Sequence, residues 1–297
     1  MWKIAGVVPI PKFNSKNNPS NYRPISLLSV VSELLERIVH FLLWEHLLTY
    51  APISDKQWGF QKGKSTTTAL LYTTHDWFTL LDQHKDVMCI FFDFKKAFDT
   101  VPHRKLLDKL CEIGVHPLLL SWLCSYLSGR EQYVLVSGAC SDRCHVLSGV
   151  PQGSVLGPLL FLIYINSITE VSLSLSTKLT LYADDMLVYK PVHSKSCYTQ
   201  LQRDINNIFQ WSQDNFMTFN ISKCKCMLLS NKRYISPPTL ALNDQPLELV
   251  QQMKYLGLVV SHNLSWSQHI QATCKKARKM LGIKIYIANF VLITSTV

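Results

Sequence analysis

Hydrophobic residues recur every three or four positions along much of the chain, which is the spacing of an amphipathic helix. Residues 26–48 show it most clearly, with leucine, valine and isoleucine on one stripe. Residues 102–114 begin at a proline and end at a glycine, as helices often do. The same spacing predicts further helices over residues 65–81, 154–168, 199–216 and 267–288.

Shorter apolar runs bounded by turn residues predict β-strands. Residues 87–92 are six consecutive apolar residues, which is typical of a strand buried on both faces. Residues 6–11 end in proline, a pattern of edge strands. We expect further strands at residues 133–137, 145–147, 179–182, 186–189, 227–230 and 255–260. This order of elements predicts an α+β fold with helices packed against one antiparallel sheet.

Composition supports a folded protein. The chain has 297 residues, of which 47% are hydrophobic and 17% charged, so disorder is excluded for most of it. Its length suits one large domain or two lobes sharing a core. No uncharged apolar run reaches the roughly 18 residues of a membrane span, and the start lacks the apolar stretch of a secretory signal. We therefore expect no membrane partner and an intracellular location.

The nine cysteines are irregularly spaced and odd in number. They form no paired CxxC motifs, so neither a zinc site nor a disulfide framework is indicated. We expect reduced thiols, most of them buried.

Charge is distributed unevenly. Lys plus Arg is 30 and Asp plus Glu is 20, which gives 30 − 20 = +10. No acidic residue precedes Glu33 and none follows Glu248, so both ends of the chain are positive. Positive ends suit a polyanionic partner, although solvated helix faces would produce the same pattern.

Three carboxylates occupy positions where a buried charge would need compensation. Asp93 directly follows the apolar run, and Asp184 and Asp185 lie at the tip of a predicted apolar hairpin. No lysine or arginine interrupts these predicted strands, whereas two divalent cations would supply the missing charge and serve phosphoryl transfer. Oxygen ligands of this kind suit Mg²⁺. The alternative is that the three acids merely cap turns.

Two loops have the composition of phosphate or base contacts. Residues 148–153 contain Gln152, a donor and acceptor, and Gly153, which permits close approach of a substrate. Residues 59–65 resemble a phosphate-binding P-loop, but the glycines have only three residues between them instead of four. A basic loop that touches nucleic-acid phosphate is the better interpretation.

Five motifs follow one another in a characteristic order: NYRPISLL at 21–28, FDFKKAFD at 92–99, GVPQGS at 149–154, YADD at 182–185 and YLG at 255–257. Together they resemble the reverse transcriptase of LINE-type (non-LTR) retrotransposons, of the Jockey/CR1-like kind, over about residues 5–281. The resemblance implies a right-hand polymerase with fingers at 1–86, palm at 87–266 and the start of a thumb at 267–297.

The implied activity is RNA-directed DNA polymerase, which transfers a nucleotide from a dNTP to a primer 3′-OH. The resemblance assigns two Mg²⁺ ions, with Mn²⁺ as a substitute, to Asp93, Asp184 and Asp185. It also implies an RNA template and a DNA primer as partners and residence in the nucleus.

The resemblance further assigns residues around the incoming nucleotide. Lys12 and Arg23 match fingers residues that hold the triphosphate. Phe98 matches the bulky side chain that excludes a 2′-OH, with plain core packing as the alternative. Gln152 and Gly153 match the loop that lines the nucleotide.

Two more assignments lie in the second half of the chain. Lys223 matches a lysine proposed to protonate pyrophosphate, a chemically sound role beside a polyphosphate. Tyr255, Leu256 and Gly257 resemble the primer-grip turn.

The chain also departs from the family pattern. Family members carry an N-terminal endonuclease, a complete thumb and a C-terminal Cys/His region, and we expect this chain to be a fragment without them. The alternative function is therefore a catalytically silent nucleic-acid-binding remnant, because duplex binding needs many phosphate contacts.

Overall fold

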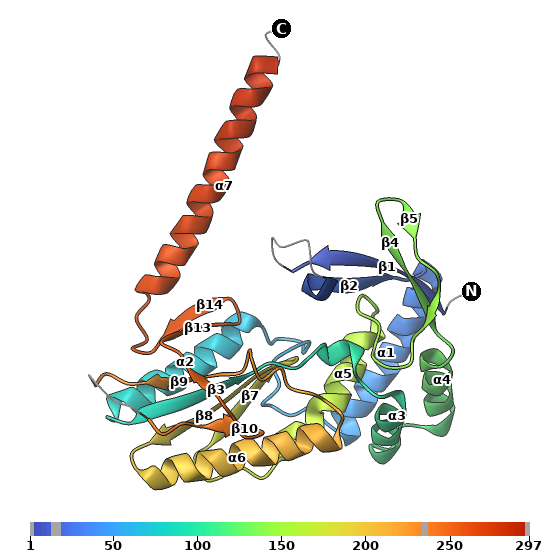
Figure 1. The fold of residues 1–297 in the computed structure, drawn as a ribbon. Coiled ribbons are helices and arrows are strands. Elements are labelled where there is room, and N and C mark those ends of the chain that lie inside the picture. The colour runs from blue at the N-terminus through green and yellow to red at the C-terminus, as the bar shows by residue number, and fades with distance from the viewer. Residues whose placement is uncertain (1–2, 13–18, 233–236, 295–297) are drawn as a thin grey trace.

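Two five-stranded β-sheets, two small two-stranded sheets and the helices packed on them make up the described part of the fold (Figure 1). The computed structural model describes residues 3–12, 19–232 and 237–294. The α-helices are α1 (Val30–Tyr50), α2 (Thr66–Asp82), α3 (His103–Glu112), α4 (Pro117–Leu127), α5 (Leu156–Ile165), α6 (Lys195–Asp214) and α7 (Ser267–Thr294). The 3-10 helices are η1 (Pro19–Asn21), η2 (Ala97–Asp99) and η3 (Asn166–Glu170).

The strands fall into four sheets. They are β1 (Ile4–Pro11), β2 (Tyr22–Leu27), β3 (Asp86–Phe92), β4 (Glu131–Val136), β5 (Ala139–Cys140), β6 (Cys144–His145), β7 (Lys178–Tyr182), β8 (Asp185–Val192), β9 (Lys225–Leu229), β10 (Ala241–Leu242), β11 (Gln245–Pro246), β12 (Glu248–Leu249), β13 (Gln252–Tyr255) and β14 (Leu258–Ser261). The α+β class is confirmed, but the expectation of one sheet is wrong, because β1, β2 and β4–β6 form a separate sheet.

The central sheet has the order β12-β9-β3-β8-β7 and is antiparallel except for the β12–β9 pair. Its middle strand, β3, is buried on both faces, as the uninterrupted apolar run predicted. Cys89 and Phe91 face a cluster that includes Trp77 of α2. Met88 and Ile90 face the larger cluster, to which α5 and α6 contribute. The sheet is therefore a rigid layer between helices.

The N-terminal sheet has the order β2-β1-β4-β5, with β6 also paired to β4. The expectation that residues 6–11 form an edge strand is only half right. Strand β1 pairs with β2 from Gly6 to Pro11, but with β4 only from Ile4 to Val7. The half that contains Pro9 and Pro11 lacks a partner on the β4 side, because proline has no N–H to donate.

Several boundaries differ from the sequence-based expectations. Residues 22–27 form β2, so α1 begins four residues later than predicted, where the Ser29 side chain accepts a hydrogen bond from Ser32 N. Helix α4 was not predicted, and Pro117 occupies its first turn. Residues 255–260 are not one strand, because β13 and β14 form a hairpin whose turn is Leu256–Gly257.

The cysteines are all unpaired, but the expectation that most are buried is wrong. Cys89, Cys197, Cys224 and Cys226 are buried, and the remaining five are exposed. Two of the exposed thiols lie on α3 and α4 and two on β5 and β6, elements that cover the protein surface.

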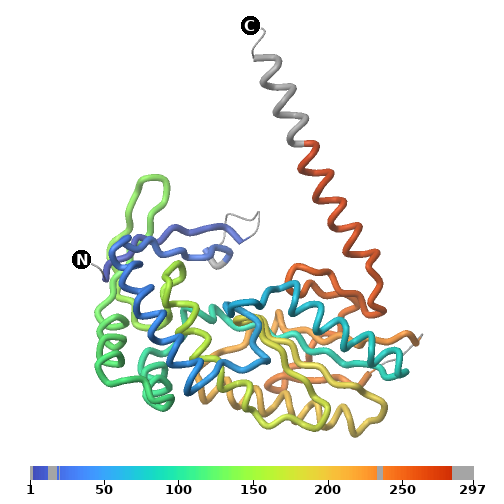
Figure 2. Tube along the Cα trace, turned by 180° about the vertical axis from the view of Figure 1, so that it is seen from behind, coloured from blue at the N-terminus to red at the C-terminus, as the bar shows by residue number. Residues whose placement is uncertain are grey.

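Helix α7 projects away from the rest of the molecule (Figures 1 and 2). Its first turns contact β14, and its side chains from Gln271 to Gly282 are almost all exposed. Figure 2 also shows α1 on the outer side of the molecule, next to the N-terminal sheet. Among the described residues, none of the helices combines the length and apolar character that crossing a bilayer requires.

A buried carboxylate connects α1 to the start of α5. Glu36 is 1% exposed, and its Oε2 accepts hydrogen bonds from Val155 N at 2.9 Å and Leu156 N at 3.2 Å. A negative group at this position satisfies two N–H groups that the helix itself leaves unpaired and complements the helix dipole. It also fixes the loop at residues 148–153, which precedes α5.

We expect Glu36→Leu to lower the free energy of unfolding by about 3 kcal/mol, because two buried N–H groups lose a charged acceptor. Urea denaturation followed by circular dichroism measures the change. Glu33→Gln, in the first turn of the same helix, is the control and should cost less than about 1 kcal/mol. Equal losses in the two variants would contradict the capping role of Glu36.

Candidate active site

The register of the central sheet brings Asp93, Asp184 and Asp185 to one end of it. Strands β3 and β8 pair Phe92 with Met186, so Asp93 and Asp185, the next residues outward, are neighbours across the ladder. Asp184 lies in the two-residue turn that joins β7 to β8. Acids far apart in the sequence therefore meet where two neighbouring strands end.

The turn that carries Asp184 is strained. Strands β7 and β8 pair Tyr182 with Asp185, which leaves Ala183 and Asp184 as the two central residues. Ala183 has φ 54°, in the left-handed region that glycine usually occupies in such hairpins. This conformation costs a residue with a Cβ about 1–2 kcal/mol, so the surrounding structure must hold it.

The surroundings of Asp184 and Asp185 disfavour the ionised form of both side chains. Burial raises the pKa of Asp184, and Asp93 raises it further, against the lowering effects of its own backbone N–H, Arg23 and Lys12. Burial, then Asp184 and Asp93, raise the pKa of Asp185 to about 6. The Asp185 side chain is exposed, but it lines a concave wall where protein displaces much of the bulk water.

Hydrogen bonds hold the backbone of Asp93 in place, but one of its carboxylate oxygens has no hydrogen-bond partner. Asn220 N donates to Asp93 O at 2.7 Å, and Asp93 N donates to Cys224 Sγ at 3.4 Å. Its Oδ2 atom is buried without a hydrogen bond. Lys223 Nζ lies 3.6 Å from that oxygen, close enough for charge attraction but too far for a hydrogen bond. The ion pair is thus open, and the Lys223 side chain is 65% exposed.

A cavity of about 450 Å³ brings these groups together with the β13–β14 hairpin. Asp93, Asp185 and Lys223 line it together with Tyr255, Leu256 and Gly257. Leu256 and Gly257 have φ 46° and 91°, the left-handed pair of a tight two-residue hairpin turn. The structure therefore brings two of the three predicted metal ligands, Asp93 and Asp185, together with the predicted proton donor and the predicted primer-grip turn around one cavity. Asp184 precedes Asp185 in the adjoining turn and does not line the cavity.

The two predicted triphosphate ligands face this site from the N-terminal sheet. Arg23 lies on β2 opposite Ile10, and Lys12 follows the end of β1, with Lys12 N bonded to Asn21 O at 2.7 Å. Both side chains are exposed, and both lower the pKa of Asp184, although less than burial raises it. Positive charge is thus directed at the carboxylates from the other sheet.

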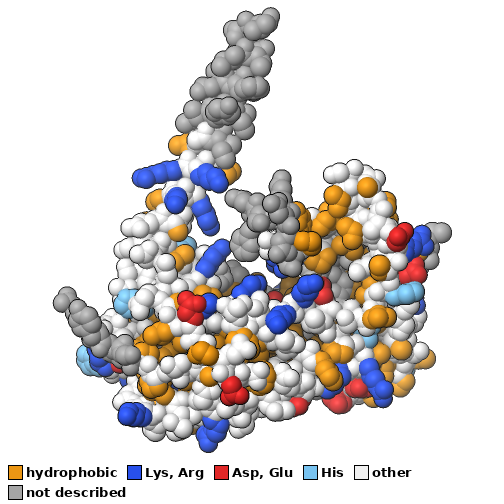
Figure 3. Space-filling model, viewed as in Figure 1, with side chains coloured by type: hydrophobic (Ala, Val, Ile, Leu, Met, Phe, Trp, Pro, Cys, Tyr) orange, Lys and Arg blue, Asp and Glu red, His pale blue; other side chains and the backbone are white. Residues whose placement is uncertain are grey.

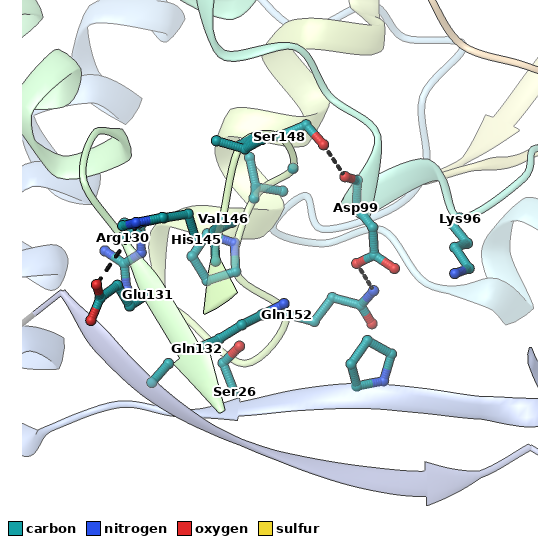
Figure 4. Close-up of a pocket in the computed structure, with 16 residues that line it drawn as sticks. Ser26, Lys96, Asp99, Arg130, Glu131, Gln132, His145, Val146, Ser148 and Gln152 are labelled. Atoms are coloured by element: carbon teal, nitrogen blue, oxygen red, sulfur yellow. Dashed lines mark hydrogen bonds and ion pairs between the residues drawn. The ribbon is translucent and has the colours of Figure 1, made fainter. Parts of the chain in front are cut away.

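Gln152 and Gly153 do not join the carboxylate cavity. Gln152 Nε2 donates to Asp99 Oδ1 at 2.8 Å within a separate polar cavity of about 370 Å³ (Figure 4). Gly153 has φ 109°, and a Cβ there would lie 2.7 Å from Ser26 O. This glycine therefore permits contact between the loop and β2, and its predicted closeness to substrate stays a prediction.

Phe98 lies in η2 and stacks on Phe161 with ring centroids 4.1 Å apart. The ring of Phe60 meets it edge-on at 6.2 Å. These contacts favour core packing, the alternative weighed for Phe98 from the sequence. Its role in excluding a 2′-OH stays a prediction.

The loop at residues 59–65 does not have the features of a P-loop, and its contact with nucleic-acid phosphate stays a prediction. Lys64 Nζ donates to Gln57 O at 2.9 Å and to Asp55 O at 3.3 Å, and lies 5.3 Å from the centroid of the Trp58 ring. The P-loop resemblance is therefore not supported, and Lys64 stabilises its own loop.

The carboxylate cluster fits a divalent cation in chemistry. It offers hard oxygen donors, an orphaned buried Oδ2 on Asp93, and two acids, Asp184 and Asp185, whose pKa values are raised by burial and by neighbouring carboxylates. As the side chains stand, no group of three or more His, Cys, Asp or Glu in the described part of the chain is arranged around a metal position. Strand β8 does contain Lys190, contrary to expectation, but its Nζ binds Ser176 and Thr177 near the other end of the strand.

Comparison with known proteins agrees with this geometry. Residues 10–260 match the family described as "Reverse transcriptase (RNA-dependent DNA polymerase)". The chain is 30% identical over 273 residues to a probable RNA-directed DNA polymerase from transposon X-element of Drosophila melanogaster, covering 91% of this chain and 30% of that protein. It is 30% identical over 281 residues to the RNA-directed DNA polymerase from mobile element jockey of the same organism, with the same coverage. It spans about a third of the length of these relatives.

Solved structures show the same fold. Apo telomerase from Candida tropicalis, truncated from its C-terminal domain, aligns with a TM-score of 0.59 at 14% identity, over 89% of this chain and 54% of that one. Telomerase from the same organism in complex with a telomeric RNA fragment gives 0.60 at 13% identity, over 90% and 45%. The expected resemblance to Jockey-type polymerases and the expected fold are both confirmed.

We expect Asp185→Asn to stabilise the metal-free protein at pH 7.5 and to leave its stability unchanged at pH 4. The folded-state pKa of about 6 lies above the ordinary aspartate value of 3.8, so ionisation of Asp185 destabilises the fold as the pH rises through this interval. Allowing for solvent at the exposed side chain, the gain is about 1 kcal/mol, or about 2–4 °C in thermal midpoint.

Thermal unfolding in EDTA measures this difference. Asp142→Asn, at an exposed acid outside the cavity, is the control and should change nothing at either pH. A stability gain for Asp185→Asn that is equal at pH 4 and pH 7.5 would contradict the origin in charge.

Proposed function

The chain belongs to the reverse transcriptase (RNA-dependent DNA polymerase) family, and from that premise we propose that it is an RNA-directed DNA polymerase domain. The proposed reaction joins a primer 3′-OH to the α-phosphate of a dNTP and releases pyrophosphate. An RNA template and a DNA primer are the proposed nucleic-acid partners. The residence in the nucleus expected from the resemblance stays a prediction.

The observation that carries this proposal is the meeting of Asp93, Asp184 and Asp185 beside an orphaned buried oxygen. We propose that these three residues hold two Mg²⁺ ions, with Mn²⁺ as a substitute. When bound, the metal neutralises the charge that develops on the attacking and leaving oxygens of phosphoryl transfer. The protein's own task is then mainly positioning, because this reaction requires little covalent chemistry from side chains.

The cations around the site have separate proposed tasks. Lys12 and Arg23 would attract and orient the triphosphate, since both act on Asp184 from the N-terminal sheet. Lys223, whose Nζ lies 3.6 Å from Asp93 Oδ2, would donate a proton to the departing pyrophosphate. Leu256 and Gly257, which also line the cavity, would support the primer end.

The duplex would lie between the two basic surfaces that Figure 3 shows. Lys and Arg side chains gather on α7 and along the upper surface of the body. On α7 they are Lys275, Lys276, Arg278 and Lys279, all exposed. Clusters of exposed Lys and Arg side chains of this kind suit contacts with nucleic-acid phosphates. We assign fingers to residues 1–86, palm to 87–266 and the start of a thumb to 267–297.

One observation favours the second candidate, a silent nucleic-acid-binding remnant. Lys223 already places a positive charge beside the Asp93 oxygen that a metal would use. If this ion pair closed in solution, the protein would bind nucleic acid through its basic surfaces without catalysis.

Primer extension on an RNA template with Mg²⁺ distinguishes the two candidates. We expect the unaltered chain to extend the primer and Asp184→Asn to lose at least 100-fold in rate, because one metal ligand is removed. Asp142→Asn should extend at the rate of the unaltered chain. Binding of the primer–template by the unaltered chain without extension would refute the polymerase and support the remnant.

Arg23→Ala should act on nucleotide binding. We expect the KM for dNTP to rise at least tenfold with a smaller change in kcat, because a charge-assisted contact to phosphate contributes about 1.5–3 kcal/mol. Steady-state kinetics at saturating primer–template measure both constants. Arg37→Ala, an exposed arginine on α1, is the control. A fall in kcat at constant KM would contradict the assignment.

A further inference from the structure

We propose that Gln57 is a positioning residue that holds the strained turn before Asp184 in the shape that metal binding requires. The inference rests on the proposed function, since it concerns the same carboxylates. Gln57 belongs to the loop between α1 and α2, more than a hundred positions away from that turn in the sequence. Nothing in the motifs of the chain assigns it a role.

The side chain of Gln57 grips the backbone of Ala183 at two points. Its Oε1 accepts a hydrogen bond from Ala183 N at 2.9 Å, and its Nε2 donates to Ala183 O at 3.3 Å. Oε1 also accepts from Gly59 N at 2.8 Å. The residue is 1% exposed, so water does not compete for these groups. The buried amide of Gln57 thus pairs with the N–H and C=O groups of Ala183, as the backbone of a neighbouring strand would.

The loop is itself locked to the neighbouring strand. Trp58 N donates to Leu181 O at 2.7 Å, and Leu181 N donates to Lys56 O at 2.8 Å, which makes residues 56–58 a short parallel extension beside β7. The backbone of Gln57 is therefore held in place by its hydrogen bonds to β7, so its side-chain amide has a fixed position relative to Ala183.

Gly59 allows the same loop to approach Ala183 closely, because it has no side chain. A Cβ at Gly59 would lie 2.4 Å from Ala183 N, a distance that real Cβ atoms do not show. Glycine at this position allows the loop backbone to lie directly against the turn. Two neighbouring residues of one loop thus act on the same alanine, one by hydrogen bonds and one by the absence of a side chain.

The residue held in this way is the strained one. Ala183 has φ 54° and directly precedes Asp184. A turn in this conformation persists only where surrounding contacts fix it. Without the amide of Gln57, the peptide between Ala183 and Asp184 is free to rotate, and the Asp184 carboxylate would then leave its place beside Asp93. Partners that orient a ligand typically change metal affinity about 10–100-fold when they are removed.

The chain offers a matched control. Gln202 on α6 grips Ala241 in the same two-point way, with Ala241 N bonded to its Oε1 at 2.9 Å and its Nε2 bonded to Ala241 O at 2.8 Å. This second grip lies outside the carboxylate cavity. Gln57→Met and Gln202→Met therefore delete the same pair of backbone hydrogen bonds at nearly the same side-chain length, once at the residue directly before Asp184 and once at Ala241.

Two measurements on the full chain test the proposal. Mn²⁺ titration followed by electron paramagnetic resonance reports metal affinity, and amide hydrogen exchange reports the turn through peptides that cover residues 181–185. We expect Gln57→Met to weaken Mn²⁺ binding about 10–100-fold and to speed exchange at Ala183 at least tenfold. Gln202→Met should leave both unchanged. In primer extension, Gln57→Met should lower kcat without a matching loss of primer–template binding.

The proposal is overturned if Gln57→Met keeps the Mn²⁺ affinity and the exchange rates of the unaltered chain, or if Gln202→Met reduces Mn²⁺ affinity equally. Should Gln57→Met fail to fold, Gly59→Ala, which displaces Ala183 by contact, is judged by the same two measurements. A chain that binds Mn²⁺ but extends no primer would refute the proposed function alone. If it binds no Mn²⁺ either, exchange at Ala183 still decides whether Gln57 holds the turn.

Discussion

The cost of gathering carboxylates at the partly buried end of a sheet is the constraint on which this site depends. The central sheet ends where Asp93 and Asp185 stand side by side, and burial raises the pKa of Asp185. A fold would ordinarily avoid such an arrangement or neutralise it with a closed ion pair. Here Lys223 stays at 3.6 Å and one oxygen of Asp93 lacks a hydrogen bond. The local charge is therefore left available to an external cation.

The rest of the fold makes that arrangement tolerable. Strand β3 is covered by apolar clusters on both faces, so the strand end cannot move to relieve the repulsion. Asn220 and Cys224 fix the backbone of Asp93 from one side, and Gln57 fixes that of Ala183 from the other. Stability of the core thus maintains a site that is itself unstable, as functional sites commonly are.

Sequence reasoning predicted the parts of this site that depend on period and order. The run at residues 87–92 identified a doubly buried strand, and the hairpin with two acids at its tip placed Asp184 and Asp185 correctly beside Asp93. It missed α4, because the apolar residues that follow Pro117 show no single stripe. It also read residues 255–260 as one strand, although Gly257 could have indicated the turn that the structure shows.

Gln57 shows why the other contacts of the site could not be predicted from the sequence. A glutamine before a glycine-bearing loop carries no local signal of its partner, since a side-chain amide can bond any backbone within its reach. The segment drew attention instead for Gly63 and Lys64, whose spacing imitates a phosphate loop, while its actual contacts are to a strand more than a hundred residues later. Periodicity records which face of an element is buried. Contacts between a loop and a distant turn leave no period, so they emerge only from the folded chain.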